Sequence, residues 1–269
     1  MSELTNVRTP RVKAARRLTK RSFREQDRRF LAEGPQAVRE ALRLPDVTVE
    51  LFATAEAEVR HAELVEEARL QGATVHRASG EVMAELAQTV TPQGVVAICR
   101  FVHVPLTDAV TADARLVAVL AHVRDPGNAG TVLRTADAAG ADSVVFTDAS
   151  VDPYNGKCVR ASAGSLFHLP VVIGSPVPQA VQHLKDSGLR VLAADGSGKR
   201  TLDEVELGGP TAWVFGNEAW GLPEEVLELC DEVVRVPIYG QAESLNLATA
   251  AAVCLYASAR AQRQASGRA

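Results

Sequence analysis

The chain has 269 residues, of which 46% are hydrophobic, and its 29 basic and 33 acidic side chains give a formal net charge of -4. This length suits one large or two modest domains, and the apolar fraction is enough for buried cores, which excludes a disordered or fibrous protein. The sequence has no run of about 18 apolar residues and no apolar signal-peptide core, so we expect a cytoplasmic protein without a membrane span. Its four cysteines form no C-x-x-C pair, so we expect neither disulfides nor a zinc site, and no metal.

The positive charge is concentrated near the N-terminus. Ten lysines and arginines lie in the segment 8–29, opposed only by Glu25 and Asp27. Such a segment attracts phosphate groups through counterion release. A solvated helix face or a frayed tail explains the same charges equally well, so this segment alone does not decide the function.

The first part of the chain alternates between helical and extended patterns. After the basic segment, Phe30, Leu31, Ala37, Val38 and Leu42 recur at helical spacing and predict an amphipathic helix. The patterns that follow predict strands over 47–54, 73–79 and 94–102 and helices over 57–72 and 80–88. A short extended connector over 103–107 marks the boundary of a small α/β domain, which we place at residues 1–104.

The second part, residues 105–269, has longer elements of the same kind. Predicted strands cover 115–123, 142–148, 169–174, 189–195, 212–216 and 232–238, and helices cover 130–139, 158–165 and 179–187. A last helix begins near Ser244 and Asn246. Strands that are almost entirely apolar and separated by helices are typical of a parallel sheet covered on both faces.

Three polar turns stand out in this second part. In residues 125–142 we expect Asn128 to cap a helix that carries Arg134 near its start, although a capped helix with an ordinary arginine ion pair would look the same. Residues 215–222 place Gly216 and Glu218 after a strand. A simple tight turn would explain the glycine as well as a ligand-binding turn does. In residues 236–250 we expect Ser244 to cap a helix, which on its own would be unremarkable.

Motifs of other enzyme classes are missing. Residues 195–200 lack the spacing of a phosphate-binding loop, and no strand is followed by G-x-G-x-x-G. No G-x-S-x-G turn occurs, and no two histidines stand at H-x-x-x-H spacing. Nucleotide hydrolases, dinucleotide oxidoreductases and serine hydrolases are therefore disfavoured.

Three short motifs occur in the three polar turns: N-x-G-x-x-x-R-T at 128–135, G-N-E at 216–218 and S-L-N at 244–246. In this order and at these spacings, they resemble the signature motifs of the SpoU (TrmH) family of RNA ribose 2'-O-methyltransferases, in the SPOUT superfamily. The resemblance covers roughly residues 115–260. The preceding part resembles, more loosely, the small ribosomal-protein-like RNA-binding domain of many members. The resemblance implies an α/β trefoil-knot domain that binds S-adenosylmethionine and a homodimer in which the second subunit completes the active site.

Residue roles follow from the resemblance. It implies cofactor contacts from Gly216, Val236, Ile238 and Leu245, and catalytic or substrate-side roles for Asn128, Arg134, Glu218, Ser244 and Asn246. RNA contacts are expected from Arg8, Arg11, Arg16, Arg17, Lys20 and Arg21.

The implied reaction is attack of a ribose 2'-hydroxyl on the sulfonium methyl group, which needs no metal. The resemblance gives deprotonation of the hydroxyl to Arg134, but an arginine almost never loses its proton, so a fixed cation beside the developing alkoxide stays an alternative. We expect the substrate to be ribosomal RNA. Transfer RNA, a non-catalytic RNA-binding module of the same fold, and an enzyme acting on a small molecule are the alternatives.

Overall fold

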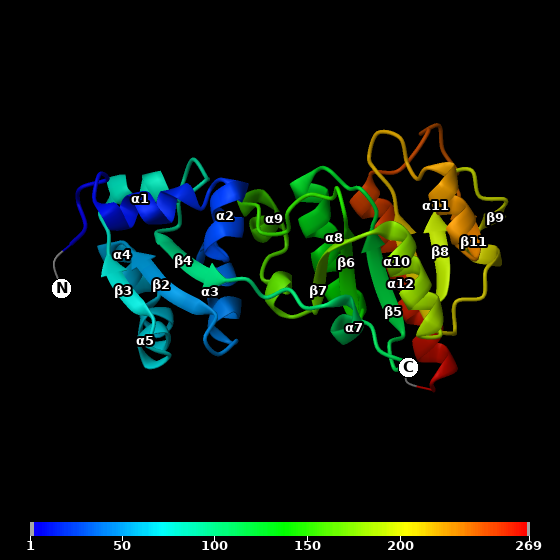
Figure 1. Cartoon of the computed structure of the whole chain (residues 1–269), viewed down its shortest axis with the longest axis horizontal. Helices are drawn as coiled ribbons and strands as arrows, with labels where there is room; N and C mark the ends of the chain where they lie inside the picture. Colours follow the sequence, from blue (N-terminus) through cyan, green and yellow to red (C-terminus); the bar gives the residue numbers. More distant parts are fainter. Residues whose placement is uncertain (1–2, 268–269) are drawn as a thin grey trace. The chain divides into compact units, whose positions relative to one another are not determined.

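The structure is a computed structural model that describes residues 3–267 (Figure 1). The chain divides into two compact units. The first consists of the described part of Met1–Val102 together with Asp152–His168, and the second consists of His103–Val151 and the described part of Leu169–Ala269. The predicted boundary between residues 104 and 105 lies two residues after the end of the first unit at Val102, and one later segment, Asp152–His168, packs with the first unit.

The first unit is a small α/β structure around a four-stranded sheet. The strands are β1 (Arg29–Glu33), β2 (Thr48–Ala53), β3 (Thr74–Arg77) and β4 (Val95–Arg100) in the order β1-β4-β2-β3, with β4 antiparallel to both neighbours and β2 parallel to β3. The helices are α1 (Pro10–Arg17), α2 (Arg21–Asp27), α3 (Pro35–Leu42), α4 (Ala55–Arg60), α5 (Ala62–Leu70), α6 (Gly80–Leu86) and α9 (Gly156–Ala161), with a 3₁₀ turn at Ser165–Phe167.

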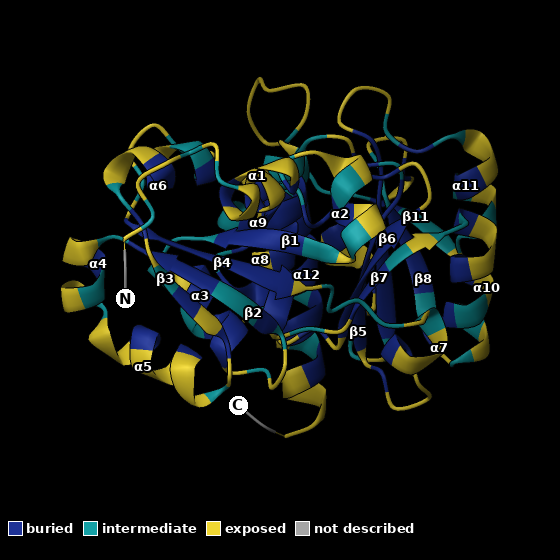
Figure 2. Ribbon diagram, turned by 60° about the vertical axis from the view of Figure 1, so that its left-hand side comes forward, coloured by how far each residue is buried: buried dark blue, intermediate teal, exposed yellow. Residues whose placement is uncertain are grey.

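Helices cover both faces of this sheet (Figure 2). Val12 of α1, Leu18 directly after α1 and Met83 of α6 form one buried cluster with Phe52 and Ile98 of the sheet. Because side chains alternate along a strand, the neighbours of Phe52 and Ile98 point to the other face, where α3 and α5 pack.

Two predictions for this unit are corrected. Phe30 and Leu31 do not belong to a helix but to β1, and the helix α3 begins only at Pro35, because proline fixes a helical φ and suits the first turn of a helix. The single helix predicted over 57–72 is broken at His61 into α4 and α5. The basic segment, for which no element was predicted, forms α1 and α2.

Aromatic and ionic contacts explain why Asp152–His168 packs with the first unit. The Tyr154 ring is buried and stacks on Phe101, with ring centroids 4.0 Å apart, and its hydroxyl accepts a hydrogen bond from the backbone of Val102 at 2.8 Å. Arg24, only 3% exposed, pairs with Asp152 at 2.7 Å. Ring stacking and a buried ion pair between residues more than fifty positions apart have no signature in local periodicity.

The second unit is a seven-stranded sheet in which every pair is parallel. Its order is β7-β6-β5-β10-β8-β11-β9, formed by β5 (Leu116–Leu120), β6 (Ser143–Thr147), β7 (Val171–Ser175), β8 (Arg190–Ala194), β9 (Arg200–Thr201), β10 (Thr211–Phe215) and β11 (Glu232–Arg235). The helices are α7 (Leu106–Ala109), α8 (Pro126–Ala139), α10 (Val177–Asp186), α11 (Glu224–Leu229) and α12 (Leu247–Ala265), with a 3₁₀ turn, η2, at Leu202–Glu204. The predicted α/β class with a parallel sheet is confirmed.

The helices of this unit lie in two layers. The helices α8 and α12 pack together and against β5 and β10, whereas α7, α10 and α11 join the core cluster on the other face. The indole N–H of Trp213 on β10 donates to Ser258 on α12 at 2.8 Å, and the Gln262 amide donates to the backbone oxygens of Arg115 and Gly209. These buried bonds fix α12, and therefore the turn before it, against the centre of the sheet.

Within residues 3–267, no helix is long and apolar enough to cross a membrane.

A candidate cofactor and catalytic cleft

A cleft of about 490 Å³ lies in the second unit, lined by the turns that follow β8, β10 and β11 and by the start of α12. The carboxyl ends of parallel strands are where open α/β sheets bind their ligands. All predicted cofactor and catalytic residues except Arg134 line this cleft: Asn128, Gly216, Glu218, Val236, Ile238, Ser244, Leu245 and Asn246. Segments separated by more than a hundred residues are thus brought to one place.

Two glycines make the turn after β10 possible. A Cβ atom on Gly216 would lie 2.4 Å from the backbone of Gly221, closer than any real contact, so only glycine fits there. Gly221 itself has a φ of 70°, in the left-handed region that glycine adopts without strain. The pair Asn217 and Gly221 closes the turn with two backbone hydrogen bonds of 2.8 and 2.9 Å. This close approach presents the backbone of the turn to the cleft.

Glu218 connects this turn to the start of α8. Its carboxylate accepts hydrogen bonds from the backbone N–H groups of Arg124 and Asp125, at 3.1 and 3.0 Å, and from the Asn128 amide at 3.2 Å. Burial acts to raise the pKa of Glu218, but these donors outweigh it and lower the pKa below its ordinary value. The side chain is therefore an anion at neutral pH, and it holds the loop after β5 in place.

Asn128 continues this network to the third motif. Its side-chain oxygen accepts a hydrogen bond of 3.0 Å from the amide of Asn246. Glu218, Asn128 and Asn246 are thus one chain of hydrogen bonds that joins all three polar turns. Interlocked polar groups of this kind hold their side chains in fixed orientations.

The predicted helix caps are corrected by one turn or less. Asp125, not Asn128, caps α8 and accepts from the Asn128 backbone at 2.8 Å, and Asn246, not Ser244, caps α12 through the backbone of Ala248. Either residue type can cap a helix, so the position depends on where the backbone leaves the sheet. Ser244 stays free to face the cleft.

Arg134 lies on α8 but does not line the cleft of its own chain. It is exposed, and no hydrogen bond or ion pair holds it to any residue that the structure describes. Asn128 and Arg134 are six residues apart on a helix with 3.6 residues per turn, so they project in different directions. Trp220, in the turn after β10, is 58% exposed beside the cleft residues.

Asp195 and Asn217 also line the cleft, but the sequence assigned a role to neither, although Asn217 lies within the G-N-E motif. Asp195 follows β8 and accepts hydrogen bonds from the backbone and hydroxyl of Ser197. Asn217, 6% exposed, donates to the backbone oxygen of His122 at 2.9 Å. A polar residue directly after an apolar strand was the available signal, since both follow strands that end at this edge of the sheet.

The lining charges fit a cationic cofactor. The carboxylates of Asp195, Glu218 and Glu243 line the cleft, and none of the lysines and arginines within residues 3–267 does. S-adenosylmethionine carries a sulfonium and an ammonium group, which anionic walls attract. The apolar side chains of Val236, Ile238 and Leu245 offer a surface for an adenine ring.

The residues expected to contact RNA belong to the first unit, and most are ion-paired there. Arg11 pairs with Glu50, Arg16 with Glu85, Arg17 with Asp27 and Arg21 with Glu25, whereas Arg8 and Lys20 are exposed and make no ion pair with the described residues. All six lie on or beside α1 and α2. The basic segment is thus an ordered surface, which rules out the alternative of a frayed tail.

Both units match known families. Residues 115–256 match the SpoU rRNA Methylase family, and residues 9–97 match the MRM3-like substrate binding domain. A Bacillus subtilis protein named 23S rRNA (guanosine(2553)-2'-O)-methyltransferase RlmP is 36% identical over 256 residues, which cover 95% of this chain and 98% of that protein. A Bordetella pertussis 23S rRNA (guanosine-2'-O-)-methyltransferase RlmB is 33% identical over 204 residues, 74% of this chain and 83% of that protein.

Solved structures agree with these matches. An rRNA methyltransferase from Sinorhizobium meliloti with bound AdoMet has a TM-score of 0.87 at 31% identity, covering 96% of this chain and 97% of that one. The SpoU methyltransferase AviRb from Streptomyces viridochromogenes, in complex with AdoMet, has a TM-score of 0.82 at 27% identity, covering 94% and 98%. The predicted family and cofactor are confirmed. The chain belongs to the SpoU family of S-adenosylmethionine-dependent RNA ribose 2'-O-methyltransferases.

Proposed function

We propose that this enzyme methylates a ribose 2'-hydroxyl in ribosomal RNA in the cytoplasm. The observation that carries the proposal is the hydrogen-bond chain from Glu218 through Asn128 to Asn246, because it fixes all three motif turns around one cleft. Support for a ribosomal substrate comes from the relatives named as 23S rRNA methyltransferases and from the substrate-binding family that matches the first unit.

The cofactor, when bound, supplies a methyl group on a sulfonium, which is already activated for transfer. In this proposal Gly216 and Leu245 hold it through their backbones, and Val236 and Ile238 contact its adenine ring. Ser244 and Asn246 orient the target ribose. The contribution of these residues is to place the hydroxyl in line with the methyl group and to exclude water.

Arg134 acts in the cleft of a second copy of the chain in this proposal. Its exposed position outside its own cleft leaves the guanidinium available to a partner. A guanidinium beside the attacking oxygen stabilises the developing alkoxide, and this role needs no loss of its proton. We therefore favour the fixed cation over the general base.

A surface on α12 suits the homodimer that the proposed role of Arg134 requires. Val253 and Tyr256 are 39% and 52% exposed, and they line a groove of about 690 Å³ between α8, η2 and α12. Large exposed apolar side chains over a groove are typical of an interface between subunits.

We also propose that the segment between β11 and α12 is threaded as the trefoil knot of the family.

Methyl transfer to RNA tests the proposal. Labelled S-adenosylmethionine is incubated with total RNA from a strain lacking this gene, and the RNA is fractionated by size and digested to nucleosides. A labelled 2'-O-methylnucleoside from the ribosomal fraction is expected. Label in the transfer RNA fraction would refute the ribosomal substrate, and cofactor binding without any label would favour a non-catalytic RNA-binding module.

A mixed dimer tests the role of Arg134. Arg134→Ala is expected to abolish activity while S-adenosylmethionine binds with nearly the normal Kd. A cleft variant such as Asn246→Ala is also expected to abolish activity. When the two inactive variants are mixed, each dimer that contains one subunit of each kind has one intact cleft, because each subunit supplies what the other lacks. If the mixture stays inactive while dimers form, Arg134 does not act across subunits.

A further inference from the structure

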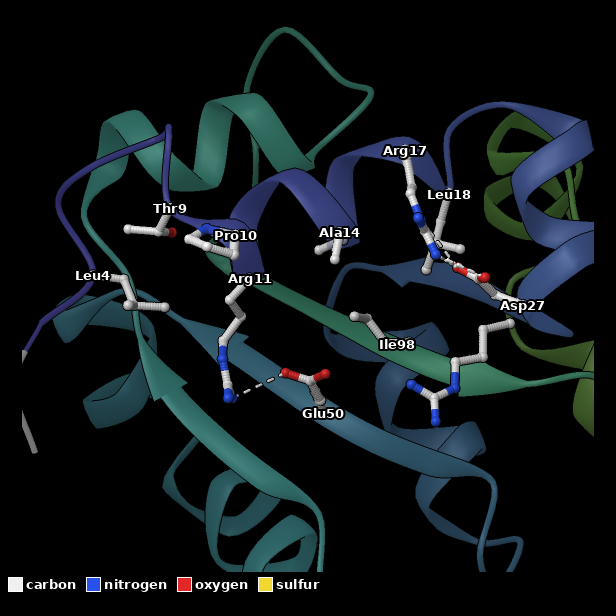
Figure 3. Close-up of a pocket in the computed structure, with 12 residues that line it drawn as sticks. Leu4, Thr9, Pro10, Arg11, Ala14, Arg17, Leu18, Asp27, Glu50 and Ile98 are labelled. Atoms are coloured by element: carbon white, nitrogen blue, oxygen red, sulfur yellow. Dashed lines mark hydrogen bonds and ion pairs between the residues drawn. The ribbon is translucent and has the colours of Figure 1, made fainter.

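The first unit contains a groove between α1 and the sheet, which we name the α1 groove (Figure 3). Its volume is about 850 Å³, within the range of sites that hold nucleotide-sized ligands. In Figure 3, Ala14 faces the groove from α1, and Ile98 faces it from β4 on the opposite side. Ala14 is exposed, so the groove is open at this point. The centre of the groove is therefore aliphatic, and Ala14 is its accessible wall, whereas Ile98 is only 4% exposed beneath it.

Three arginines surround this aliphatic centre. Arg11 and Arg17 reach down from α1, and Arg29 lies on β1. Arg17 is held by Asp27 through bonds of 2.6 to 3.1 Å, and its guanidinium lies 5.1 Å from the centroid of the Phe23 ring. Its orientation is therefore fixed before any ligand binds.

Arg29 differs from the other two. It is half-buried in the groove and its charge interacts with that of Glu50, but no hydrogen bond or close ion pair to the described residues engages its N–H groups. N–H groups of a partly buried guanidinium that make no hydrogen bond are available to an anion that binds beside them. The planar set of N–H donors of a guanidinium suits the oxygens of a phosphate group.

Glu50 provides the complementary groups on the floor of the groove. One of its carboxylate oxygens, Oε2, contacts Arg11 at 3.3 Å and His76 at 2.8 Å, whereas Oε1 has no hydrogen-bond partner among the described residues. The hydrogen bond from His76 is the largest cause that lowers the pKa of Glu50, so the carboxylate is ionised. A free carboxylate oxygen next to guanidinium N–H groups matches the adjacent donor and acceptor groups on the edge of a nucleobase.

We propose that the α1 groove binds an unpaired nucleotide of the substrate RNA, with the base against the exposed wall at Ala14, the base edge on Glu50 and Arg11, and a phosphate on Arg29. This rests on the proposed function in taking RNA as the substrate. A helix and a sheet enclose the groove, so it can take a single strand but not a duplex. Unpaired nucleotides are also the part of an RNA whose bases proteins can read directly.

Filling the groove tests the proposal without changing any charge. Ala14→Leu adds bulk at the exposed wall, where no core is disturbed, and Ala62→Leu makes the same change at an exposed position on α5, which packs on the opposite face of the sheet. Binding of a fluorescent single-stranded RNA of about ten nucleotides is followed by anisotropy. Ala14→Leu is expected to weaken binding about tenfold and Ala62→Leu less than about twofold, with unchanged thermal unfolding for both.

Charge removal tests the phosphate contact. Arg29→Ala is expected to lower the slope of log affinity against log salt by about 0.7, the value for one phosphate on a single strand. Arg69→Ala, which removes one exposed charge from α5, leaves the slope unchanged. Competition between polyglutamate and the fluorescent RNA distinguishes a nucleotide site from a general anion site, since polyglutamate carries no base to fill the groove.

The proposal is overturned if Ala14→Leu binds RNA as well as Ala62→Leu, or if the wild-type enzyme does not bind single-stranded RNA. Methyl transfer is measured in parallel. An enzyme that methylates RNA normally with a filled groove would refute the groove and leave the proposed function standing. RNA binding that needs the groove, without any methyl transfer, would refute the proposed function and leave the groove standing.

Discussion

Replacing Glu218 by glutamine tests whether the carboxylate organises the catalytic cleft. The three hydrogen bonds to Arg124, Asp125 and Asn128 are charge-assisted, and such bonds contribute about 1.5 to 3 kcal/mol each when fully buried. Glu218 is exposed, however, so solvent screening reduces their sum to about 2 kcal/mol. Glutamine keeps the shape but loses the charge and turns an N–H group toward a backbone donor. We therefore expect methyl transfer to fall about 30-fold.

The assay is the initial rate of methyl transfer to RNA, together with calorimetric titration of S-adenosylmethionine. Glu243→Gln is the matched control, because it removes the same charge from the same cleft and breaks no hydrogen bond to the described residues. Glu243→Gln is expected to lower activity by less than about threefold. Equal activity of the two variants would refute the positioning role of Glu218.

The pH dependence of the Glu218 effect has a defined sign. The pKa of Glu218 is lower in the folded protein than its ordinary value of 4.5. Its contribution is therefore complete above pH 4.5 and is lost as the pH falls through the folded-state pKa. The ratio of wild-type to Glu218→Gln activity should be constant from about pH 5 to pH 8. A ratio that changes within this range would show that Glu218 itself exchanges a proton during the reaction.

Three further predictions concern the cleft, the first unit and the RNA. Gly216→Ala should destabilise the fold by about 1 to 3 kcal/mol and abolish cofactor binding, measured by thermal unfolding and calorimetry. Gly209→Ala, at an exposed position outside the cleft where an added Cβ would meet nothing within 4 Å, should leave both unchanged, and similar values for the two would contradict the close approach. Arg24→Ala removes the guanidinium that pairs with the largely buried Asp152 carboxylate and should cost about 3 kcal/mol in denaturant unfolding, against about 0.5 kcal/mol for Arg21→Ala at an exposed pair. A small effect of the first would contradict the burial. RNA affinity should fall steeply with salt, and a flat dependence would contradict phosphate contacts from the basic segment.

Local pattern predicted most strands of both units and most helices of the second. Apolar runs such as 115–123 and 142–148 became β5 and β6 with their ends shifted by a few residues, because a strand buried on both faces must be apolar throughout. The predictions failed where two patterns overlapped. Phe30 and Leu31 fit a helical period with the residues of α3, but the turn at Gly34 separates them into β1.

The sequence by itself determined the family and the residue types of the cleft, because the three polar turns keep their order and spacing along the chain. Only the tertiary structure showed that Glu218 binds the loop after β5, that Asn128 meets Asn246, and that Arg134 lies outside its own cleft. It also placed Asp152–His168 with the first unit. The physical reason is the same in each case. Hydrogen bonds and packing between residues about a hundred positions apart depend on how strands are ordered in the sheet, and this order leaves no periodic signal in the sequence.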